Sequence, residues 1–488
     1  MSKKNQNYTN RKQNRFQPER MRGNVFVNNN GRQWLPGENG RAANVERLLK
    51  GAKEEKKEIA GNMAGYKDSG VEWIGAIPKG WNVSKIRYHL KWFSKKNEPD
   101  KEVLSVYREL GVVKKNERDD NHNRTPLDLT QYKYVRPGDL VVNKMKAWQG
   151  SVGVSDFEGI VSPAYFIYEF TSKMINKKYL HHLLRGCYKD EMMRLSGGIR
   201  VGQWDLSSYE FERMPIILPP LPEQQRIADF LDTKCGILDR TIDAVSRQIE
   251  DLEKYKKALI TKTVTKGICK KGEPERAMKD SGVEWIGGIP EEWDVSKVKY
   301  NFSTFKKIPG KESEKYERLS LTMNGVKHRE KWTAEGLQPK DFMSYQLLRK
   351  GDLVFRLIDL QNPSKSRRVA LSHDTGLISP AYTILHADNN KMLPEYAEMF
   401  FLMMSYLDVF NALGSCGVRS SINNAELMKI PVPVPPLAEQ QQIADYLDEK
   451  CKNIDNRVQK RREQLEWLME YKKSLIFDYV TGKKRVEK

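Results

Sequence analysis

The strongest constraint on the fold is a long helical segment that occurs twice in the chain. One copy begins with Pro-Pro-Leu-Pro-Glu-Gln-Gln at 219–225, and the other begins with Pro-Pro-Leu-Ala-Glu-Gln-Gln at 435–441. Because 435 minus 219 is 216, the two copies keep a constant shift of 216 positions. Apart from Gly236, neither copy contains glycine or proline between its entry and its end. Each copy therefore predicts a helix of about 40 residues, or ~60 Å at the usual rise per residue.

Each of these helices carries a narrow apolar seam. Apolar residues alternate at spacings of three and four in both copies, a heptad pattern typical of helices that pair with another helix. We expect the two copies to pack on each other, antiparallel if the units that they follow are related by a pseudo-two-fold axis. The alternative is an ordinary amphipathic helix that lies on its own unit. The residues predicted to form the pairing are Leu231, Leu238, Ile242, Ile249, Leu447, Ile454, Val458 and Leu465.

The segments that precede the helices are duplicated as well. Lys-Asp-Ser-Gly-Val-Glu-Trp-Ile-Gly at 67–75 recurs letter for letter at 279–287. An Arg-x-Gly-Asp-Leu-Val turn and a Ser-Pro-Ala-Tyr string recur farther along each copy, whereas the stretches between these strings differ. The pattern predicts an internal duplication with a long period, in which two units share a scaffold and carry different surfaces.

Five segments follow from these boundaries. Residues 1–62 form a basic extension with no counterpart in the repeat, and we expect it to be mostly disordered. The expected fold class is α+β, with two mixed α/β domains joined by two long antiparallel coiled-coil helices. The remaining segments are a first domain at 63–221, a first long helix with its linker at 222–277, a second domain at 278–434, and a second long helix with a basic tail at 435–488.

Composition limits the partners and the compartment. The formal net charge of +20 favours a polyanionic partner, with nucleic acid ahead of a membrane surface. No apolar run approaches the ~18 residues of a membrane span, and the N-terminus lacks the apolar core of a secretory signal. The cysteines show neither a metal-binding nor a disulfide spacing, which indicates a reducing compartment. We therefore expect a cytoplasmic protein that contacts no membrane.

No catalytic or metal-binding motif stands out in the sequence. It contains no GxxxxGK[ST] phosphate loop, no GxSxG nucleophile elbow, and no histidine pair at the spacing of a helical metal site. His181 and His182 are adjacent, which suits a solvated helix face better than a metal site. We therefore expect no catalytic residue, no metal site and no enzymatic activity.

Both domains instead contain loops in which cations, amides and aromatic side chains are interleaved. These residue types hold phosphates and read base edges. Two unlike reading domains predict recognition of two different short DNA sequences separated by a gap that is not read. Arg200 and Arg419 recur at matching places after glycine-containing turns, so each is expected to serve one half-site. The residues predicted to bind DNA are Lys144, Lys146, Gln149, Arg200, Arg356, Arg367, Arg368 and Arg419.

Together these strings resemble the specificity subunit of type I restriction-modification systems. The Gly-Val-Glu-Trp-Ile-Gly openings, the Gly-Asp-Leu turns, the Ser-Pro-Ala-Tyr strings and the Pro-Pro-Leu-x-Glu-Gln-Gln helix entries carry the resemblance, which covers about 63–488. It implies that the two domains are target recognition domains that read a bipartite, asymmetric site. It also implies that the helices near 222–265 and 438–481 serve as molecular ruler and docking surface. The extension before residue 63 departs from the family pattern.

The resemblance also implies the partners. Two modification subunits, which carry S-adenosylmethionine and methylate adenine at N6, and restriction subunits, which are ATP-dependent DNA translocases with nuclease domains, would assemble with the chain on double-stranded DNA. The chain itself would bind no cofactor, and S-adenosylmethionine, ATP and Mg would lie on the partners. Three alternatives stay open: a stand-alone bipartite DNA-binding protein, an orphan specificity subunit without an active restriction partner, and a coiled-coil adaptor without a DNA role. A steep salt dependence of DNA affinity would exclude the adaptor.

Overall fold

The computed structural model describes most of the chain after the N-terminal extension. Of the predicted extension at 1–62, only β1 (Phe26–Val27) and its antiparallel partner β2 (Gln33–Trp34) lie inside the described residues. Two compact units are present, one within residues 1–177, 191–224 and 481–485, and the other within 178–190, 225–480 and 486–488. The described residues are 26–27, 33–34 and 65–486, apart from 109, 118–124, 199–203, 269–271, 273–275, 331–340, 362–366 and 415–419.

The first domain is built around a four-stranded antiparallel sheet with the strand order β11-β10-β13-β6. Its strands are β3 (Tyr66–Asp68), β4 (Ala76–Pro78), β5 (Asn82–Lys85), β6 (Leu90–Phe93), β7 (Leu104–Tyr107), β8 (Gly111–Lys114), β9 (Lys133–Val135), β10 (Leu140–Asn143), β11 (Val152–Val154), β12 (Gly159–Val161), β13 (Tyr165–Phe170), β14 (Ser196–Gly197), β15 (Asp205–Leu206) and β16 (Pro215–Leu218). Its helical elements are η2 (Ile86–Tyr88), η3 (Lys115–Glu117), η4 (Ala147–Gln149), α2 (Lys177–Cys187), α3 (Lys189–Leu195) and α4 (Ser208–Arg213).

The second domain repeats this sheet with the corresponding strand order β25-β24-β27-β20. The registers also correspond, because Leu140 faces Tyr168 in the first sheet and Leu353 faces Leu385 in the second. Its strands are β17 (Met278–Asp280), β18 (Gly288–Pro290), β19 (Asp294–Lys297), β20 (Phe302–Thr304), β21 (Arg318–Thr322), β22 (Gly325–Arg329), β23 (Gln346–Leu348), β24 (Leu353–Phe355), β25 (Val369–Leu371), β26 (Gly376–Ile378), β27 (Thr383–Ala387) and β28 (Pro431–Val434). Its helical elements are α6 (Val298–Asn301), η5 (Gly310–Lys315), α7 (Pro394–Tyr406), α8 (Val409–Leu413) and α9 (Asn424–Leu427).

The cores of the two domains match as closely as their sheets. Leucine and β-branched side chains dominate the central strands, and β10, β12, β24 and β26 are buried along their whole length. The first core consists of Leu104, Val106, Val112, Val135, Val141, Val161 and Ile167, and the second of Leu319, Leu321, Leu348, Val354, Ala370, Ile378 and Ile384. The duplicated strings therefore specify one scaffold used twice, as the sequence predicts.

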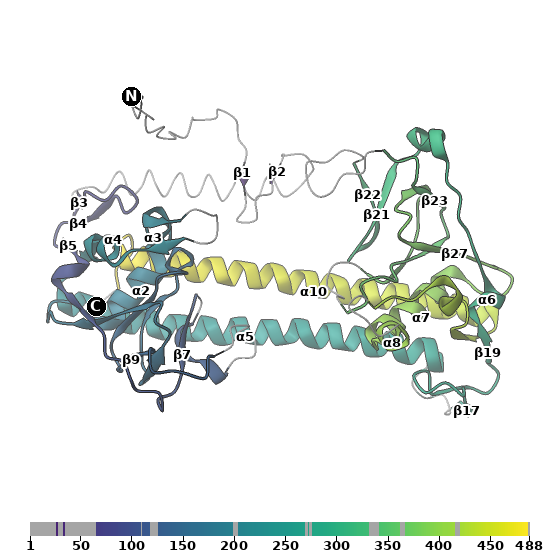
Figure 1. The fold of residues 1–488 in the computed structure, drawn as a ribbon, viewed down its shortest axis with the longest axis horizontal. Helices are drawn as coiled ribbons and strands as arrows, with labels where there is room; N and C mark the ends of the chain where they lie inside the picture. Colours follow the sequence, from purple (N-terminus) through teal and green to yellow (C-terminus); the bar gives the residue numbers. More distant parts are fainter. Residues whose placement is uncertain are drawn as a thin grey trace, which may run out of the picture. The chain divides into compact units, whose positions relative to one another are not determined.

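The two long helices form an antiparallel pair. They are α5 (Leu221–Lys266) and α10 (Leu437–Val480), and each of their four ends lies one residue from the predicted spans 222–265 and 438–481 (Figure 1). Three ion pairs join them, and the residue numbers fall along α5 as they rise along α10: Lys256–Asp455 at 2.6 Å, Glu253–Arg462 at 2.7 Å and Asp239–Lys472 at 2.5 Å. The predicted pairing is thus confirmed. Among the described residues, no helix has the length and apolar character needed to cross a bilayer.

The predicted seam lies between the helices, but part of it is incompletely covered. Leu231 and Leu447 are fully buried, and Ile454 and Val458 are nearly so. Cys235 and Cys451 are buried on the same seam, where burial raises the pKa of each thiol to about 11, so both act as small hydrophobic side chains. The partly covered seam positions are Leu238, Ile242, Ile249 and Leu465.

A glutamate and a glutamine fix the start of each long helix on its domain. In the second unit, the Trp293 indole donates to Glu439 at 2.8 Å. The buried Gln440 amide donates to the carbonyls of Lys391 and Pro435 and accepts from the Leu393 amide. The first unit repeats this network with Trp81, Glu223, Gln224 and the backbone of Met174, Asn176 and Pro219. The Pro-Pro-Leu-x-Glu-Gln-Gln string is therefore a joint between domain and helix.

Replacement of Gln440 by leucine tests this joint. The change leaves the buried Pro435 carbonyl and the part-buried Lys391 carbonyl and Leu393 amide without this partner, so we expect the free energy of unfolding to fall by about 2–3 kcal/mol. Urea unfolding followed by circular dichroism measures the change. Gln441→Leu is the matched control, because Gln441 is exposed and its amide bonds only Asp445 in the next turn. Equal losses in both variants would contradict the role assigned to Gln440.

Candidate nucleic-acid interface

The Ser-Pro-Ala-Tyr strings form the same frame in each domain. In the first, the Lys133 ammonium donates to the Tyr165 carbonyl at 2.7 Å. In the second, the Gln346 amide donates to the Tyr382 carbonyl at 2.7 Å and to the Ser379 carbonyl at 3.0 Å. Lys133 and Gln346 occupy equivalent positions, because each begins the strand that pairs with the segment just before Ser-Pro-Ala-Tyr. A shared backbone frame thus carries different side chains in the two domains.

Positive charge and aromatic surface meet at this frame in the first domain. The Asn143 amide, at the end of β10, donates to the Tyr165 hydroxyl at 3.2 Å. The Lys133 ammonium lies 5.8 Å from the Trp92 ring centroid, and Trp92 is 45% exposed. Burial lowers the pKa of Lys133, and the neighbouring Lys96 and Lys144 lower it further. An anion at this place would relieve the repulsion among the three lysines, which is the electrostatic character of a phosphate-binding surface.

The loop after β10 presents the predicted residues of the first domain. The Lys144 ammonium pairs with Asp205 at 2.8 Å, so its position is fixed by a side chain from β15. Lys146 is exposed and Gln149 is half-buried. The Trp148 and Trp204 rings meet edge to face at 5.6 Å beside this loop. The loop therefore offers cations, an amide and aromatic surface within a fixed turn.

In the second domain, arginine side chains lie where the first domain has the loop after β10. Arg356 directly follows β24 and is the counterpart of Asn143, which is the last residue of β10 and pairs with Tyr165. Its guanidinium lies 3.5 Å from Asp359. Burial raises the pKa of Tyr382, and the nearby Arg356, Arg318 and Arg329 oppose the shift. Because arginine can hold guanine edges or phosphates with paired hydrogen bonds, this cluster differs from the first domain in what it can recognise.

The remaining predicted DNA contacts have different outcomes. Arg367 is half-buried and lies 3.3 Å from Glu398. The prediction for Arg368 is corrected: it is buried, and its guanidinium donates to the carbonyls of Ile358, Asp359 and Leu360, so it supports a loop and does not face a ligand. Arg200 and Arg419 lie outside the described residues.

Sequence reasoning missed Trp92 and Lys133 in the first domain and Arg318 and Gln346 in the second. None of them lies in a basic run or near the Ser-Pro-Ala-Tyr strings in the sequence. Strand pairing brings Lys133 and Gln346 to the tyrosine, since β9 pairs with β12 and β23 with β26. One signal in the sequence could have identified Lys133 and Gln346. They stand at equivalent positions before the Gly-Asp-Leu turns, and the two copies carry unlike polar residues there.

Comparisons with known proteins agree with this geometry. The family model of the type I restriction modification DNA specificity domain matches residues 78–254 and 381–466. The type I restriction enzyme MjaVIII specificity subunit of Methanocaldococcus jannaschii is 26% identical over 84% of this chain and 94% of its own length. The putative MjaX specificity subunit of the same organism is 25% identical over 85% and 96%, respectively. A chain from a solved type I R-M system is similar in fold, with a TM-score of 0.56, 13% identity, and coverage of 84% of this chain and 99% of that chain.

Proposed function

The chain belongs to the type I restriction-modification DNA specificity family, and we propose that it reads a bipartite, asymmetric DNA site and directs adenine-N6 methylation and restriction by partner subunits. A specificity subunit recognises DNA and does not catalyse, so the expectation of a non-catalytic chain is confirmed at the level of the family. Each domain would read one half-site. The long helices would set the gap between the half-sites.

One observation supports the bipartite site above all others. The two domains share strand order, register and the frame around Ser-Pro-Ala-Tyr, yet they place Lys133 and Asn143 at the positions where the second domain has Gln346 and Arg356. Phosphate contacts position a protein on DNA, whereas base contacts specify the sequence. Unlike side chains on a common frame are what two different half-sites require.

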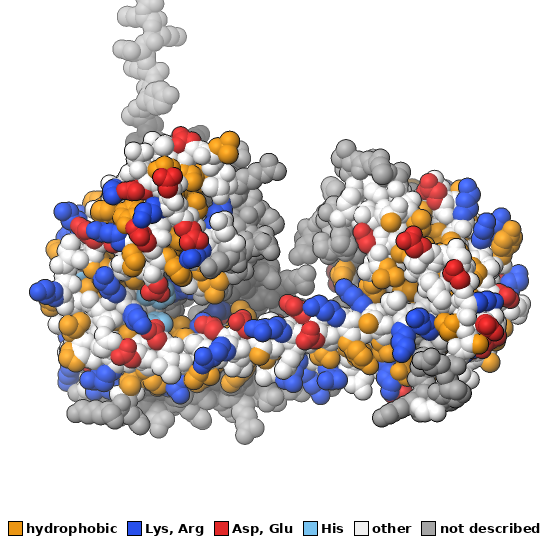
Figure 2. All heavy atoms as spheres, turned by 90° about the horizontal axis from the view of Figure 1, so that it is seen from below, with side chains coloured by type: hydrophobic (Ala, Val, Ile, Leu, Met, Phe, Trp, Pro, Cys, Tyr) orange, Lys and Arg blue, Asp and Glu red, His pale blue; other side chains and the backbone are white. Residues whose placement is uncertain are grey.

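The partners follow from the same proposal. Two modification subunits would hold S-adenosylmethionine, flip the target adenine and methylate it, and restriction subunits would use ATP and Mg. This chain would bind none of these cofactors itself. The long helices support a docking role, because their charged faces are interspersed with apolar side chains in Figure 2, and α10 exposes a stacked pair of aromatic rings at Trp467 and Tyr471.

Single-molecule sequencing of adenine methylation tests the proposal. Cells that produce the modification subunit are compared with and without this chain. We expect one split, asymmetric motif to be methylated only when the chain is present. Methylation that does not depend on the chain would contradict the proposal, and DNA binding without methylation would favour the stand-alone DNA-binding protein.

Replacement of Trp467 by alanine tests the docking role of α10. Trp467 is 62% exposed and stacks on Tyr471 with the rings 5.3 Å apart, so its loss leaves the interior of this chain intact. Trp467→Ala is expected to weaken binding of the modification subunit by about 2 kcal/mol, or roughly 30-fold, which is typical of an aromatic interface anchor. Titration by surface plasmon resonance measures it, with exposed Lys473→Ala as the control. Unchanged affinity would exclude this part of α10 from the interface.

A further inference from the structure

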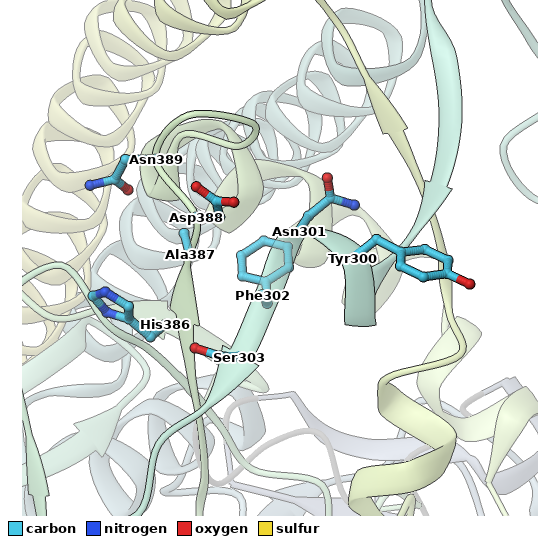
Figure 3. A pocket seen from close by; sticks show the side chains of 8 residues that line it. All are labelled: Tyr300, Asn301, Phe302, Ser303, His386, Ala387, Asp388 and Asn389. Atoms are coloured by element: carbon cyan, nitrogen blue, oxygen red, sulfur yellow. The ribbon is translucent and has the colours of Figure 1, made fainter.

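An exposed tyrosine follows the same strand in both domains. Tyr88 ends η2, directly after β5, and is 61% exposed; Tyr300 lies in α6, directly after β19, and is 59% exposed. Figure 3 shows Tyr300 extending from α6 away from the other labelled side chains. A cation precedes each ring: the Arg87 guanidinium lies 4.9 Å from the Tyr88 centroid, and the Lys299 ammonium 4.6 Å from the Tyr300 centroid.

Two further cations complete each set. The Ile86 amide donates to the Met214 carbonyl, so the adjacent Arg213 lies beside η2. The Lys299 amide donates to the Met428 carbonyl, which brings Lys429 beside α6 in the same way. We call these sets the basic turns: the first is Lys85, Arg87, Tyr88 and Arg213, and the second is Lys297, Lys299, Tyr300 and Lys429. All eight side chains are exposed.

The positive charge of the basic turns is uncompensated. Among the described residues, none of their six cations forms an ion pair with a carboxylate. Neighbouring acids are engaged elsewhere: Glu212 accepts from the Tyr168 hydroxyl, Glu426 accepts from the Asn423 amide, and Asp388, in the hollow beside Tyr300, pairs with Lys391 at 3.1 Å. Exposed cations that share one turn and have no carboxylate partner favour an anionic ligand.

Descent from a common unit does not by itself explain why the basic turns match. Nearby exposed positions have diverged, since Lys79 corresponds to Glu291 and Lys91 to Ser303. The turns themselves are held by local contacts that need neither tyrosine nor cation: His89 bonds Ser84 at 2.8 Å in the first domain, and Asn301 bonds the equivalent serine in the second. The fold therefore does not require the exposed side chains of the two basic turns to be alike.

We propose that the two basic turns are equivalent phosphate-binding sites, one per recognition domain. They bind the DNA backbone and do not contribute to sequence recognition. The inference rests on the proposed function and deepens it. Phosphates look the same at every half-site, so contacts to them can stay the same in both domains while base contacts differ. Arg87 donates to the Tyr88 hydroxyl oxygen at 2.9 Å, which leaves the hydroxyl proton available to a phosphate oxygen.

The salt dependence of DNA affinity tests this assignment. The triple variant Lys85→Gln/Arg87→Gln/Arg213→Gln in the full chain should reduce the slope of log affinity against log salt by about 3, since each phosphate contact contributes ~0.9. Affinity at 0.15 M salt should fall on the order of 100-fold, equally for DNA with and without the recognised motif. The control variant Lys79→Gln/Lys173→Gln/Lys189→Gln removes the same charge from other exposed lysines and should leave the slope within about 1 of the unaltered chain.

Tyr88→Phe gives a second test that preserves the shape and charge of the turn. It should weaken binding by about 2–10-fold on every DNA sequence, the usual range for one hydrogen bond. An unchanged salt slope in the triple variant, or a loss confined to one motif, would overturn the assignment. Loss of modification-subunit binding with an unchanged slope would make the basic turns a protein-docking site. Failure of the unaltered chain to bind DNA would instead refute the proposed function itself.

Discussion

Replacement of Ile454 by aspartate should lower the free energy of unfolding of the second unit by about 4 kcal/mol or more. Ile454 is 4% exposed on the seam of α10, and the change removes its apolar contacts and buries a carboxylate without a partner. Because α5 and α10 are held together by this seam and by exposed ion pairs of small individual value, the helix pair should separate. Loss of helical circular dichroism during urea titration measures the effect.

The matched control for Ile454 lies two residues away. Asn456→Asp introduces the same side chain on the exposed face of the same helix and should change the free energy of unfolding by less than about 0.5 kcal/mol. If both variants unfold at the urea concentration of the unaltered chain, the helices are stable without the seam, and the paired-helix account is wrong.

The triple variant Lys144→Ala/Lys146→Ala/Gln149→Ala is expected to abolish recognition of one half-site and leave the other unchanged. If each side chain makes one base contact, their joint loss amounts to about 3–6 kcal/mol, which is a more than 100-fold loss of affinity for that half-site. The loss should affect only one half-site, because all three residues lie in the loop after β10 of the first domain. Binding to DNA libraries randomised at either half-site measures both effects.

Arg356→Ala is the counterpart in the second domain and should relax the other half-site alone. Arg356 is only slightly exposed and lies near Asp359, so unfolding must be followed in parallel to show that the domain stays intact. Equal loss of both half-sites in either variant would contradict the assignment of one half-site to each domain. Unchanged specificity in both variants would move the reading surface away from the Ser-Pro-Ala-Tyr frame.

The helices and the duplication could be predicted from sequence because their signals are local and repeated. The seam spacing, the lack of glycine and proline, and the Pro-Pro entries place both helices almost to the residue. The identical nine-residue strings reveal a common scaffold before any contact is known. The role of Gln224 and Gln440 in the joint was not predictable, since each bonds backbone about 50 positions away.

The reading surface was harder to predict because it depends on strand pairing between distant segments. Arg368 stands in a basic run with Arg367, which suggested an exposed pair. The backbone enters β25 at the next residue, and this turns the Arg368 side chain inward beneath the carbonyls of 358–360. Lys133 shows the converse, because a lysine at the start of a short apolar strand becomes part of the charged surface only once β9 pairs with β12.

A chain in which residues 278–434 are replaced by 66–218 tests the central claim most directly. The exchange preserves the shared contacts with the helices, since the Tyr179 hydroxyl donates to the Val480 carbonyl and the Tyr396 hydroxyl to the Val264 carbonyl, both at 3.1 Å. Adenine methylation is then mapped in cells that also produce the modification subunit. The predicted motif contains the half-site of the first domain twice and lacks the half-site of the second. An unchanged motif would contradict the claim that each domain reads its own half-site.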